Sequence, residues 1–292
     1  MQQLATTFIG GLTTGAVYSA FALSLVLIWR STRIVNFAQA PMAMATTLLS
    51  LSLIERGVPF WLAFVGALLA GLVLGALVER LVVRHVEGAS EINAVILTLG
   101  LFIVLHAVAA IVWGNTYRSY PAPFGLRGIE VGGSTLGITP FGIFTVLAVL
   151  VVMIVLHQLF TRTDLGLRMR ASAFNKEVAR LLGVRVGTML TVGWALAAVV
   201  GSLSGILIGG GSLVHPSFMD SVVVFGFVAA VLGGLDSPLG AVVGGLAMGV
   251  ALSFVSGYVG SGLVPLAALL ILTVVLLVRP NGLFSRTHER TV

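Results

Sequence analysis

The sequence contains no cysteine, a single lysine and few charged residues of any kind. Without cysteine there is no disulfide framework, no thiolate nucleophile and no cysteine-based metal site. The five histidines are scattered without metal-ligand spacing, and no GxxxxGK[ST] loop, HExxH or GxSxG stretch occurs. We therefore predict that the chain is not an enzyme and has no cofactor and no metal site.

Apolar residues are what the sequence has in excess. Of its 292 residues, 58% are hydrophobic and 9% are charged, whereas a typical soluble domain has roughly 25% charged residues. The mean hydropathy is +1.11. A soluble fold cannot bury so much apolar surface, so the surroundings must be lipid. We predict one all-α transmembrane domain over residues 1–292, a helix bundle of about eight to ten spans.

Nine apolar runs are candidate spans. They cover about 8–29, 38–54, 60–83, 92–113, 141–160, 189–211, 221–235, 241–258 and 263–278. No basic residue precedes the first run, so we interpret it as a retained span and not as a secretory signal. The run 221–235 is short and is bracketed by Pro, Gly and Asp, which indicates a broken or re-entrant helix.

Ionisable residues are rare inside these runs. Glu79 and Glu91 lie near the ends of spans, where we predict an interfacial position. His106 lies in the middle of a span, where we predict a histidine that is buried and hydrogen-bonded within the bundle.

Basic residues are distributed unequally between the two sides of the membrane. With the N-terminus outside, one side receives thirteen Lys and Arg and the other three, Arg56, Arg118 and Arg127. The thirteen are Arg30, Arg33, Arg80, Arg84, Arg162, Arg168, Arg170, Lys176, Arg180, Arg185, Arg279, Arg286 and Arg290. The positive-inside rule makes the side with thirteen cytoplasmic, and it places the C-terminus there. The net charge of +6 thus indicates orientation, and we predict no nucleic-acid partner.

The most basic loop runs from Thr161 to Thr188 and holds six of the basic residues. Within it, Phe174, Val178 and Leu181/Leu182 recur at helical spacing, which predicts one short helix with an apolar face. Lys176, Glu177 and Arg180 take the other face, and Gly183 suits the C′ position that ends a helix. The apolar face must rest on a lipid interface or on another protein.

Glycines recur at four-residue steps in several spans. They are Gly71/Gly75, Gly201/Gly205/Gly209, Gly240/Gly244 and Gly245/Gly249. Small residues at this spacing let helix backbones approach closely. We predict that they pack helices within the bundle, with an oligomer interface as the alternative.

Several stretches resemble one family, the LivH-type inner-membrane permease of branched-chain amino acid ABC importers, also known as the hydrophobic amino acid uptake family. The stretches are GAVYSAFALSLVLI (15–28), IVNFAQ (34–39), TLGL (98–101), RASAFNKEVARLLGV (170–184), VLGGLDSPLGA (231–241) and RPNGLF (279–284). They resemble the family's GxxYALxALGLxLI, INFAHG, TxGL, RAxAxNxxxAxLxGI, VxGGxGSxxGA and RPxGLF motifs. The order is also the same and covers nearly the whole chain.

The resemblance implies a permease subunit in a bacterial inner membrane that translocates branched-chain amino acids. Its expected partners are a second homologous permease, two cytoplasmic ATP-binding cassette ATPases and a periplasmic solute-binding protein. It also implies an ATPase-coupling helix. The residues expected there are Arg170, Ala171, Phe174, Asn175, Glu177, Val178, Ala179, Leu182 and Gly183.

Two further sets of residues are candidates for the transport pathway. Asn36, Phe37, Gln39 and Thr98 are candidate pathway residues, although Asn36 and Gln39 fit a helix cap equally well. His215 and Asp220 are candidates for an outer gate, with a simple turn at Pro216 as the alternative.

The sequence also departs from the family pattern. Ala40-Pro41 stands where the family usually has Gly followed by a polar residue. Asp236 stands where the family usually has Gly. Urea or short amides are therefore alternative substrates. An ion-coupled secondary transporter or channel is the rival class, and it would need Asp220 and Asp236 to coordinate ions. A membrane-embedded enzyme lacks any convergent catalytic set.

Overall fold

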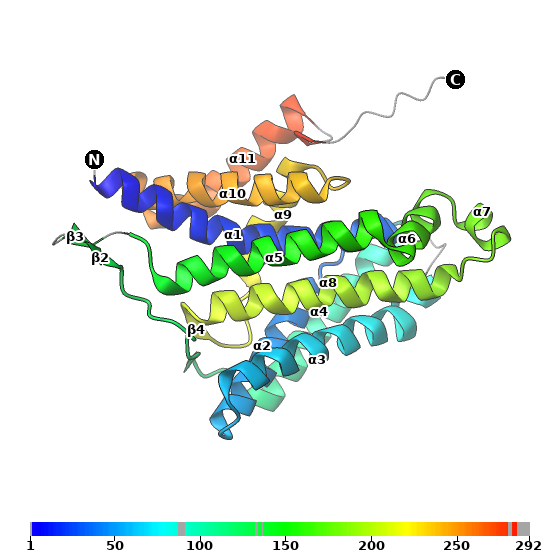
Figure 1. Cartoon of the computed structure of the whole chain (residues 1–292), viewed down its shortest axis with the longest axis horizontal. Helices are drawn as coiled ribbons and strands as arrows, with labels where there is room; N and C mark the ends of the chain where they lie inside the picture. The colour runs from blue at the N-terminus through cyan, green and yellow to red at the C-terminus, as the bar shows by residue number, and fades with distance from the viewer. Residues whose placement is uncertain (1, 87–90, 132–133, 136, 280–281, 285–292) are drawn as a thin grey trace.

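The computed structural model describes residues 2–86, 91–131, 134–135, 137–279 and 282–284, which form a bundle of long helices (Figure 1). The helices are α1 (Gln2–Thr32), α2 (Gln39–Glu55), α3 (Phe60–Leu81), α4 (Glu91–Trp113), α5 (Pro140–Arg162), α6 (Asp164–Phe174), α7 (Lys176–Leu181), α8 (Val186–Gly209), α9 (Asp220–Gly233), α10 (Pro238–Phe254) and α11 (Val264–Val278). Seven helices of the described chain are long and apolar enough to cross a membrane. The predicted all-α polytopic bundle is confirmed.

Short elements connect the helices. A 3-10 turn, Val83–Val86, follows α3, while a π-helical turn, Val255–Val259, and a 3-10 turn, Ser261–Leu263, join α10 to α11. Strand β1 (Arg118–Ser119) pairs antiparallel with β4 (Leu213–Val214). Strand β2 (Glu130–Val131) pairs with β3 (Ser134–Thr135). All four strands lie at one end of the bundle, which we call the strand end, while α6 and α7 lie at the opposite end, the basic end (Figure 1).

Side-chain caps determine where several helices begin. Thr139 accepts a hydrogen bond from the Gly142 N–H at the start of α5, and Ser237 accepts one from the Gly240 N–H at the start of α10. In both helices the next residue is proline, whose fixed φ and missing N–H suit the first helical position. These starts can be read from the sequence.

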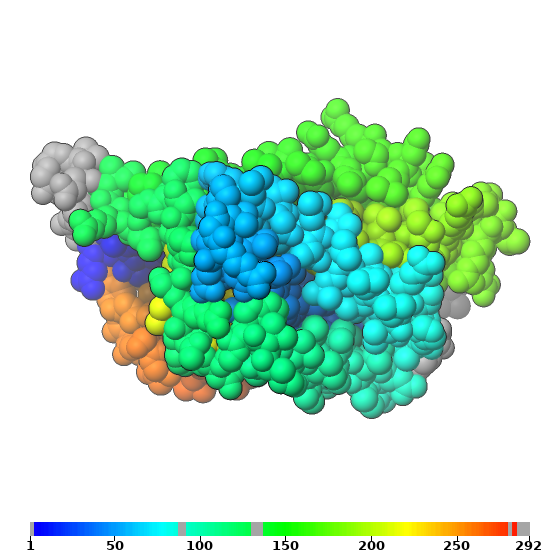
Figure 2. All heavy atoms as spheres, turned by 90° about the horizontal axis from the view of Figure 1, so that it is seen from below, coloured from blue at the N-terminus to red at the C-terminus, as the bar shows by residue number. Residues whose placement is uncertain are grey.

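Helices α1 and α8 form the centre of the bundle. In each, 78% of the apolar window is buried, against 11% in α4 and 6% in α11. Helix α1 packs along α10, and α8 packs against α2 and α3. Figure 2 shows α2, α3 and α4 covering one face of the molecule. The exposed apolar side chains of the outer helices suit a lipid environment, as the composition predicts.

Glycines make the central contacts possible. A Cβ added at Gly15 on α1 would lie 2.8 Å from the Leu246 Cα on α10, and one at Gly75 on α3 would lie 2.6 Å from the Ala198 Cβ on α8. Gly205 on α8 faces the Ala43 carbonyl of α2 in the same way. The prediction that these glycines pack helices within the bundle is confirmed.

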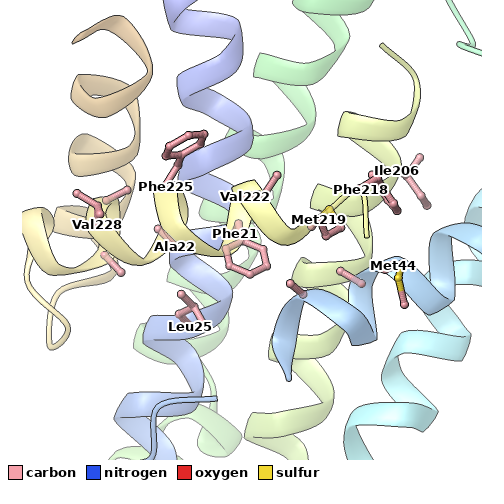
Figure 3. Close-up of a cluster of buried hydrophobic side chains, with 14 of the residues drawn as sticks. Phe21, Ala22, Leu25, Met44, Ile206, Phe218, Met219, Val222, Phe225 and Val228 are labelled. Atoms are coloured by element: carbon pink, nitrogen blue, oxygen red, sulfur yellow. The ribbon is translucent and has the colours of Figure 1, made fainter. Parts of the chain in front are cut away.

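Two of the apolar helices, α2 and α9, are each too short to cross the bundle without an added non-helical segment. Helix α2 begins inside it, where the Gln39 Nε2 donates to the Ala197 carbonyl in the middle of α8. Helix α9, with 14 residues, lies across α1, and its Phe225 and Val222 pack beside Phe21 and Ala22 (Figure 3). Non-helical segments complete both crossings, residues 33–38 before α2 and residues 213–219 before α9. The short run 221–235 is therefore a broken span, and it does not return to the side from which it enters.

Candidate functional site

The basic loop forms two helices and not one. Helix α6 ends at Phe174, and α7 begins at Lys176. Asn175 lies between them in extended conformation, and its Oδ1 accepts hydrogen bonds from the N–H groups of Glu177 and Val178, each at 3.0 Å. The prediction of one helix that carries Phe174 and Val178 on the same face is wrong, because Asn175 caps a new helix instead of continuing the old one. We call this junction the α6–α7 elbow, residues 164–183.

The elbow leaves large apolar side chains in the open. Phe174 and Leu181 are each 88% exposed, Leu182 is 76% exposed and Val178 is 50% exposed. Gly183 has φ +80° and ends α7, so the sequence prediction for this residue is confirmed. Exposed apolar patches of this kind mark sites of interaction. The elbow also projects at the basic end (Figure 1), where a partner can reach it.

One side of α7 is anchored to the bundle. Ala179 is buried and packs in a small cluster with Val186 and Leu190 of α8, next to Ala171 of α6. Arg170 is exposed on α6 and its Nε lies 3.4 Å from the Gly166 carbonyl. Of the predicted coupling residues, Ala179 therefore positions the elbow, while the exposed apolar residues are the ones available to a partner.

An ion pair with a buried carboxylate supports the same end of the bundle. The Glu79 carboxylate on α3 accepts bonds from the Arg84 guanidinium and from the Thr191 hydroxyl of α8, at 3.0 and 2.6 Å. Its side chain is 1% exposed. Glu79 lies two residues before the end of α3, and its interfacial position stays a prediction; α8 covers the carboxylate and supplies one of its hydrogen bonds. The Glu91 side chain and the residues Arg286 and Arg290 lie outside the described residues.

The candidate pathway residues gather where α2 begins. The Asn36 Nδ2 donates to the Gln39 Oε1 at 3.1 Å, and the Asn36 Oδ1 accepts from the Ala38 N–H at 3.0 Å. The Thr98 hydroxyl donates to the Val35 carbonyl at 3.3 Å. Asn36, Gln39 and Thr98 are buried. These polar side chains therefore satisfy the broken backbone before α2, because lipid offers no hydrogen bonds.

Phe37, unlike its polar neighbours, contacts an aromatic side chain of another helix. It is partly buried, and its ring lies 6.3 Å from the ring of Phe227 on α9. The two broken spans thus meet through an aromatic contact close to the start of α2.

The predicted outer gate residues have different partners. The His215 ring lies 4.4 Å from the Tyr117 ring, near the β1–β4 pair. Asp220 is the first residue of α9, and its Oδ1 lies 2.9 Å from the Nε2 of His106 on α4. The structure therefore joins Asp220 to His106, a pairing that sequence reasoning missed. The available signal was one ionisable residue in the middle of a span, His106, and one directly before a short apolar run, Asp220. The prediction that His106 is hydrogen-bonded is confirmed.

Tyr120 ties the strand end to α2. Its hydroxyl shares a hydrogen bond of 2.8 Å with Ser50. Burial raises the pKa of the Tyr120 phenol above its usual range, while the bond to Ser50 acts in the opposite direction. The phenol is thus neutral at physiological pH and serves as a hydrogen-bonding group.

At the basic end, an ion pair links the segment before α2 to the segment after α9. The Arg33 guanidinium, after α1, pairs with the Asp236 carboxylate, between α9 and α10. Arg33 is the one non-glycine residue with positive φ, +60°, in the described part of the chain. Sequence reasoning missed this pair too, because 203 positions separate the partners.

Two of the sequence blocks that resemble family motifs also meet at this end. The Leu283 N–H donates to the Leu232 carbonyl at 2.9 Å, and Gly282, with φ +83°, lies against Gly234. The blocks 231–241 and 279–284 therefore form one unit in space, although Pro280 and Asn281 lie outside the described residues.

Among the described residues, no group of three or more His, Asp and Glu could hold a metal ion. Asp220 faces His106 at the start of α9, and Asp236 faces Arg33 beyond the end of α9. They do not converge on a common site.

This arrangement defines a class, a multi-pass helical membrane protein with two broken spans and an exposed apolar elbow at one end. Comparison with known proteins specifies it further. The family described as "Branched-chain amino acid transport system / permease component" matches residues 7–279. The chain belongs to this family, and the resemblance seen in the sequence is confirmed.

Relatives of known name align along nearly the entire chain. The high-affinity branched-chain amino acid transport system permease protein LivH of Salmonella typhimurium is 27% identical over 295 residues, 97% of this chain and 96% of LivH. BraD of Pseudomonas aeruginosa, a permease protein of the same description, is 28% identical over 310 residues, 100% of this chain and 98% of BraD. Among solved structures, PsaBC from Streptococcus pneumoniae in complex with Fab aligns with a TM-score of 0.47 and 13% identity, covering 96% of this chain and 91% of that one.

Proposed function

We propose that this chain is the permease subunit of an ATP-binding cassette importer that moves branched-chain amino acids across a bacterial inner membrane. Two named relatives of full-length similarity support the substrate class. The chain itself catalyses no reaction in this proposal. It supplies half of a translocation pathway and converts the motion of an ATPase into alternating access.

One observation carries the proposal, the exposed apolar surface of the α6–α7 elbow. Phe174, Leu181 and Leu182 are among the most exposed large apolar side chains of the described chain. Asn175 and Ala179 fix the elbow from both sides, so its surface is preorganised. A rigid apolar surface of this size fits the groove of a protein partner, as in helix-in-groove recognition. The partner in this proposal is a cytoplasmic ATPase subunit.

The basic end is cytoplasmic in this proposal. Arg33, Arg84 and Arg170 lie toward it, while Arg118 pairs with Glu55 at the strand end. The positive-inside rule then places α6, α7 and the C-terminus in the cytoplasm. A periplasmic solute-binding protein would meet the strand end. A second, homologous permease and a second ATPase would complete the importer.

The broken spans form the moving part of the proposed pathway. Asn36, Phe37, Gln39 and Thr98 lie at the start of α2, and their polar atoms bond to one another or to backbone. Opening the pathway requires these bonds to exchange for bonds to water or substrate. At the outer side, the proposed gate consists of Asp220 with its partner His106, and of His215, which contacts Tyr117.

Uptake by reconstituted protein tests the function. The full chain is co-expressed with its neighbouring genes, reconstituted in liposomes and supplied with labelled leucine, urea or a short amide. We expect leucine uptake that requires ATP and the ATPase. ATP-driven uptake of urea or amide without leucine would change the substrate class. Uptake driven by an ion gradient without ATP would instead support the secondary transporter, to which the separate ion pairs of Asp220 and Asp236 give no support.

Co-purification tests the elbow separately from transport. We expect Phe174→Asp and Leu181→Asp to weaken ATPase binding by roughly thirtyfold or more, as for loss of an interface hot spot. Leu126→Asp is the matched control, because Leu126 is 54% exposed in the loop before α5 at the opposite end. Normal ATPase retention by both elbow variants would refute the docking proposal.

A further inference from the structure

A cavity of about 710 Å³ opens at the basic end between α1, α5, α6 and the start of α10. Its charged and polar lining comes from Arg30, Arg33, Arg170, His157 and Asp236, among others. No role described above involves this cavity. A ligand bound here would be independent of the proposed substrate and of the proposed ATPase partner.

The charges of the cavity are unbalanced. Three arginines and one aspartate line it, and the aspartate pairs with Arg33. In the part of the chain that the structure describes, neither Arg30 nor Arg170 forms an ion pair. The Arg30 guanidinium is partly buried and lies 5.7 Å from the centre of the Phe160 ring. The Asp236 carboxylate also interacts with Arg30, but it is paired with Arg33, so the three arginines outnumber the one carboxylate. This excess of positive charge beside an apolar wall favours binding of an anion.

The lining changes character with depth. Along α1 it passes from Leu23 and Leu27 to Arg30, and along α5 from Met153 and Leu156 to Phe160 and Thr161. At 1.5 Å per residue, the apolar part extends about 10 Å into the bundle below Arg30. The cavity therefore has an apolar trough on the membrane side and a cationic rim at the end of the helices.

We propose that the cavity binds an anionic phospholipid of the leaflet at the basic end, which is the inner leaflet in the orientation proposed above. The phosphate lies between Arg30 and Arg170, and an acyl chain follows the trough formed by Leu23, Leu27 and Leu156. A free anion would use the rim but would leave the apolar trough without a partner, which is why the observations favour a lipid. Basic pockets between spans at the cytoplasmic side suit such head groups. The bound lipid would connect the central helix α1 to α6, the first helix of the elbow.

Native mass spectrometry of the full-length chain, released from micelles with equal amounts of phosphatidylglycerol and phosphatidylcholine, tests the assignment. We expect selective retention of phosphatidylglycerol. The double variant Arg30→Gln/Arg170→Gln should weaken it roughly thirtyfold, about fivefold for each basic side chain. Arg168→Gln/Arg180→Gln is the control with equal charge loss, because those exposed arginines do not line the cavity.

Filling the trough separates a lipid from a free anion. Leu156→Trp should reduce phosphatidylglycerol retention and leave any binding of inorganic phosphate unchanged, and it provides a second test if the double arginine variant does not fold. Equal retention of the two lipids, or an equal loss in the control, would overturn the proposal. Displacement of phosphatidylglycerol by inorganic phosphate, with no effect of Leu156→Trp, would assign the cavity to a free anion instead.

Discussion

The Nε2 of His106 lies 2.9 Å from the Oδ1 of Asp220 and joins α4 to the first residue of α9. His106 is seven residues from the end of α4 at Trp113, about 10 Å along the helix. Asp220 is 47% exposed in the single chain. An ionisable pair at this depth is costly against lipid, so we expect this face to lie against water or protein.

This pair should be measurable as an energetic coupling between two helices. We expect His106→Leu to lower the stability of the folded chain, because it leaves the Asp220 carboxylate without its partner. Asp220→Leu on the His106→Leu background should recover part of the loss. A double-mutant cycle by unfolding in mixed micelles should give a coupling of about 0.6–1.7 kcal/mol, the range for polar contacts between membrane helices. Strictly additive effects would show that the two side chains do not interact.

Glu79 should be essential for the stability of the basic end. We expect Glu79→Leu to destabilise the fold by about 1.5–3 kcal/mol, since the partly exposed Arg84 guanidinium and the Thr191 hydroxyl lose the buried carboxylate that accepts their hydrogen bonds. Thermal unfolding in detergent measures the effect. The matched control is Glu55→Leu, because Glu55 is 49% exposed and its contact with Arg118 is 3.5 Å long, so its loss should cost less than about 1 kcal/mol. Equal destabilisation by the two variants would contradict the buried network.

The glycines between α1 and α10 should not tolerate larger side chains. A Cβ at Gly249 would overlap the backbone of Gly15, whereas nothing lies within 4 Å of a Cβ at Gly100 on α4. We expect Gly249→Val to destabilise the bundle by about 1–3 kcal/mol or to prevent folding, because overpacking displaces backbone. Gly100→Val is the control and should fold normally. The yield of monodisperse protein measures both, and equal yields would disprove close α1–α10 packing.

Substitutions at Arg33 and at Asp236 should distinguish the effect of backbone strain on stability from the effect of their ion pair. Its φ of +60° is disfavoured for any residue but glycine, by roughly 1–2 kcal/mol. We expect Arg33→Gly to be neutral or slightly stabilising, since relief of this strain offsets the loss of the exposed pair with Asp236. Asp236→Ala removes the pair alone and should destabilise by less than about 1 kcal/mol. Melting temperatures in detergent compare the two, and a lower value for Arg33→Gly than for Asp236→Ala would refute the strain.

The sequence predicted the spans more accurately than the elbow between them. The run expected at 92–113 is α4, Glu91–Trp113, and the run expected at 60–83 is α3, Phe60–Leu81. At the elbow, helical spacing suggested one helix through Phe174 and Val178. The Asn175 cap was present in the sequence, but spacing alone does not tell whether an asparagine continues a helix or begins a new one.

By itself, the sequence determined the class of protein, the places of the spans and the sorting of basic residues to one end. These properties depend on composition over about twenty residues and on the cost of placing charge in lipid, so they need no knowledge of contacts. Only the tertiary structure decided which polar groups pair and where the broken spans begin. Asp220 meets His106, and Arg33 meets Asp236, across 114 and 203 positions. Such pairs follow from how glycine-rich helices pack, and sequence spacing carries no record of that packing.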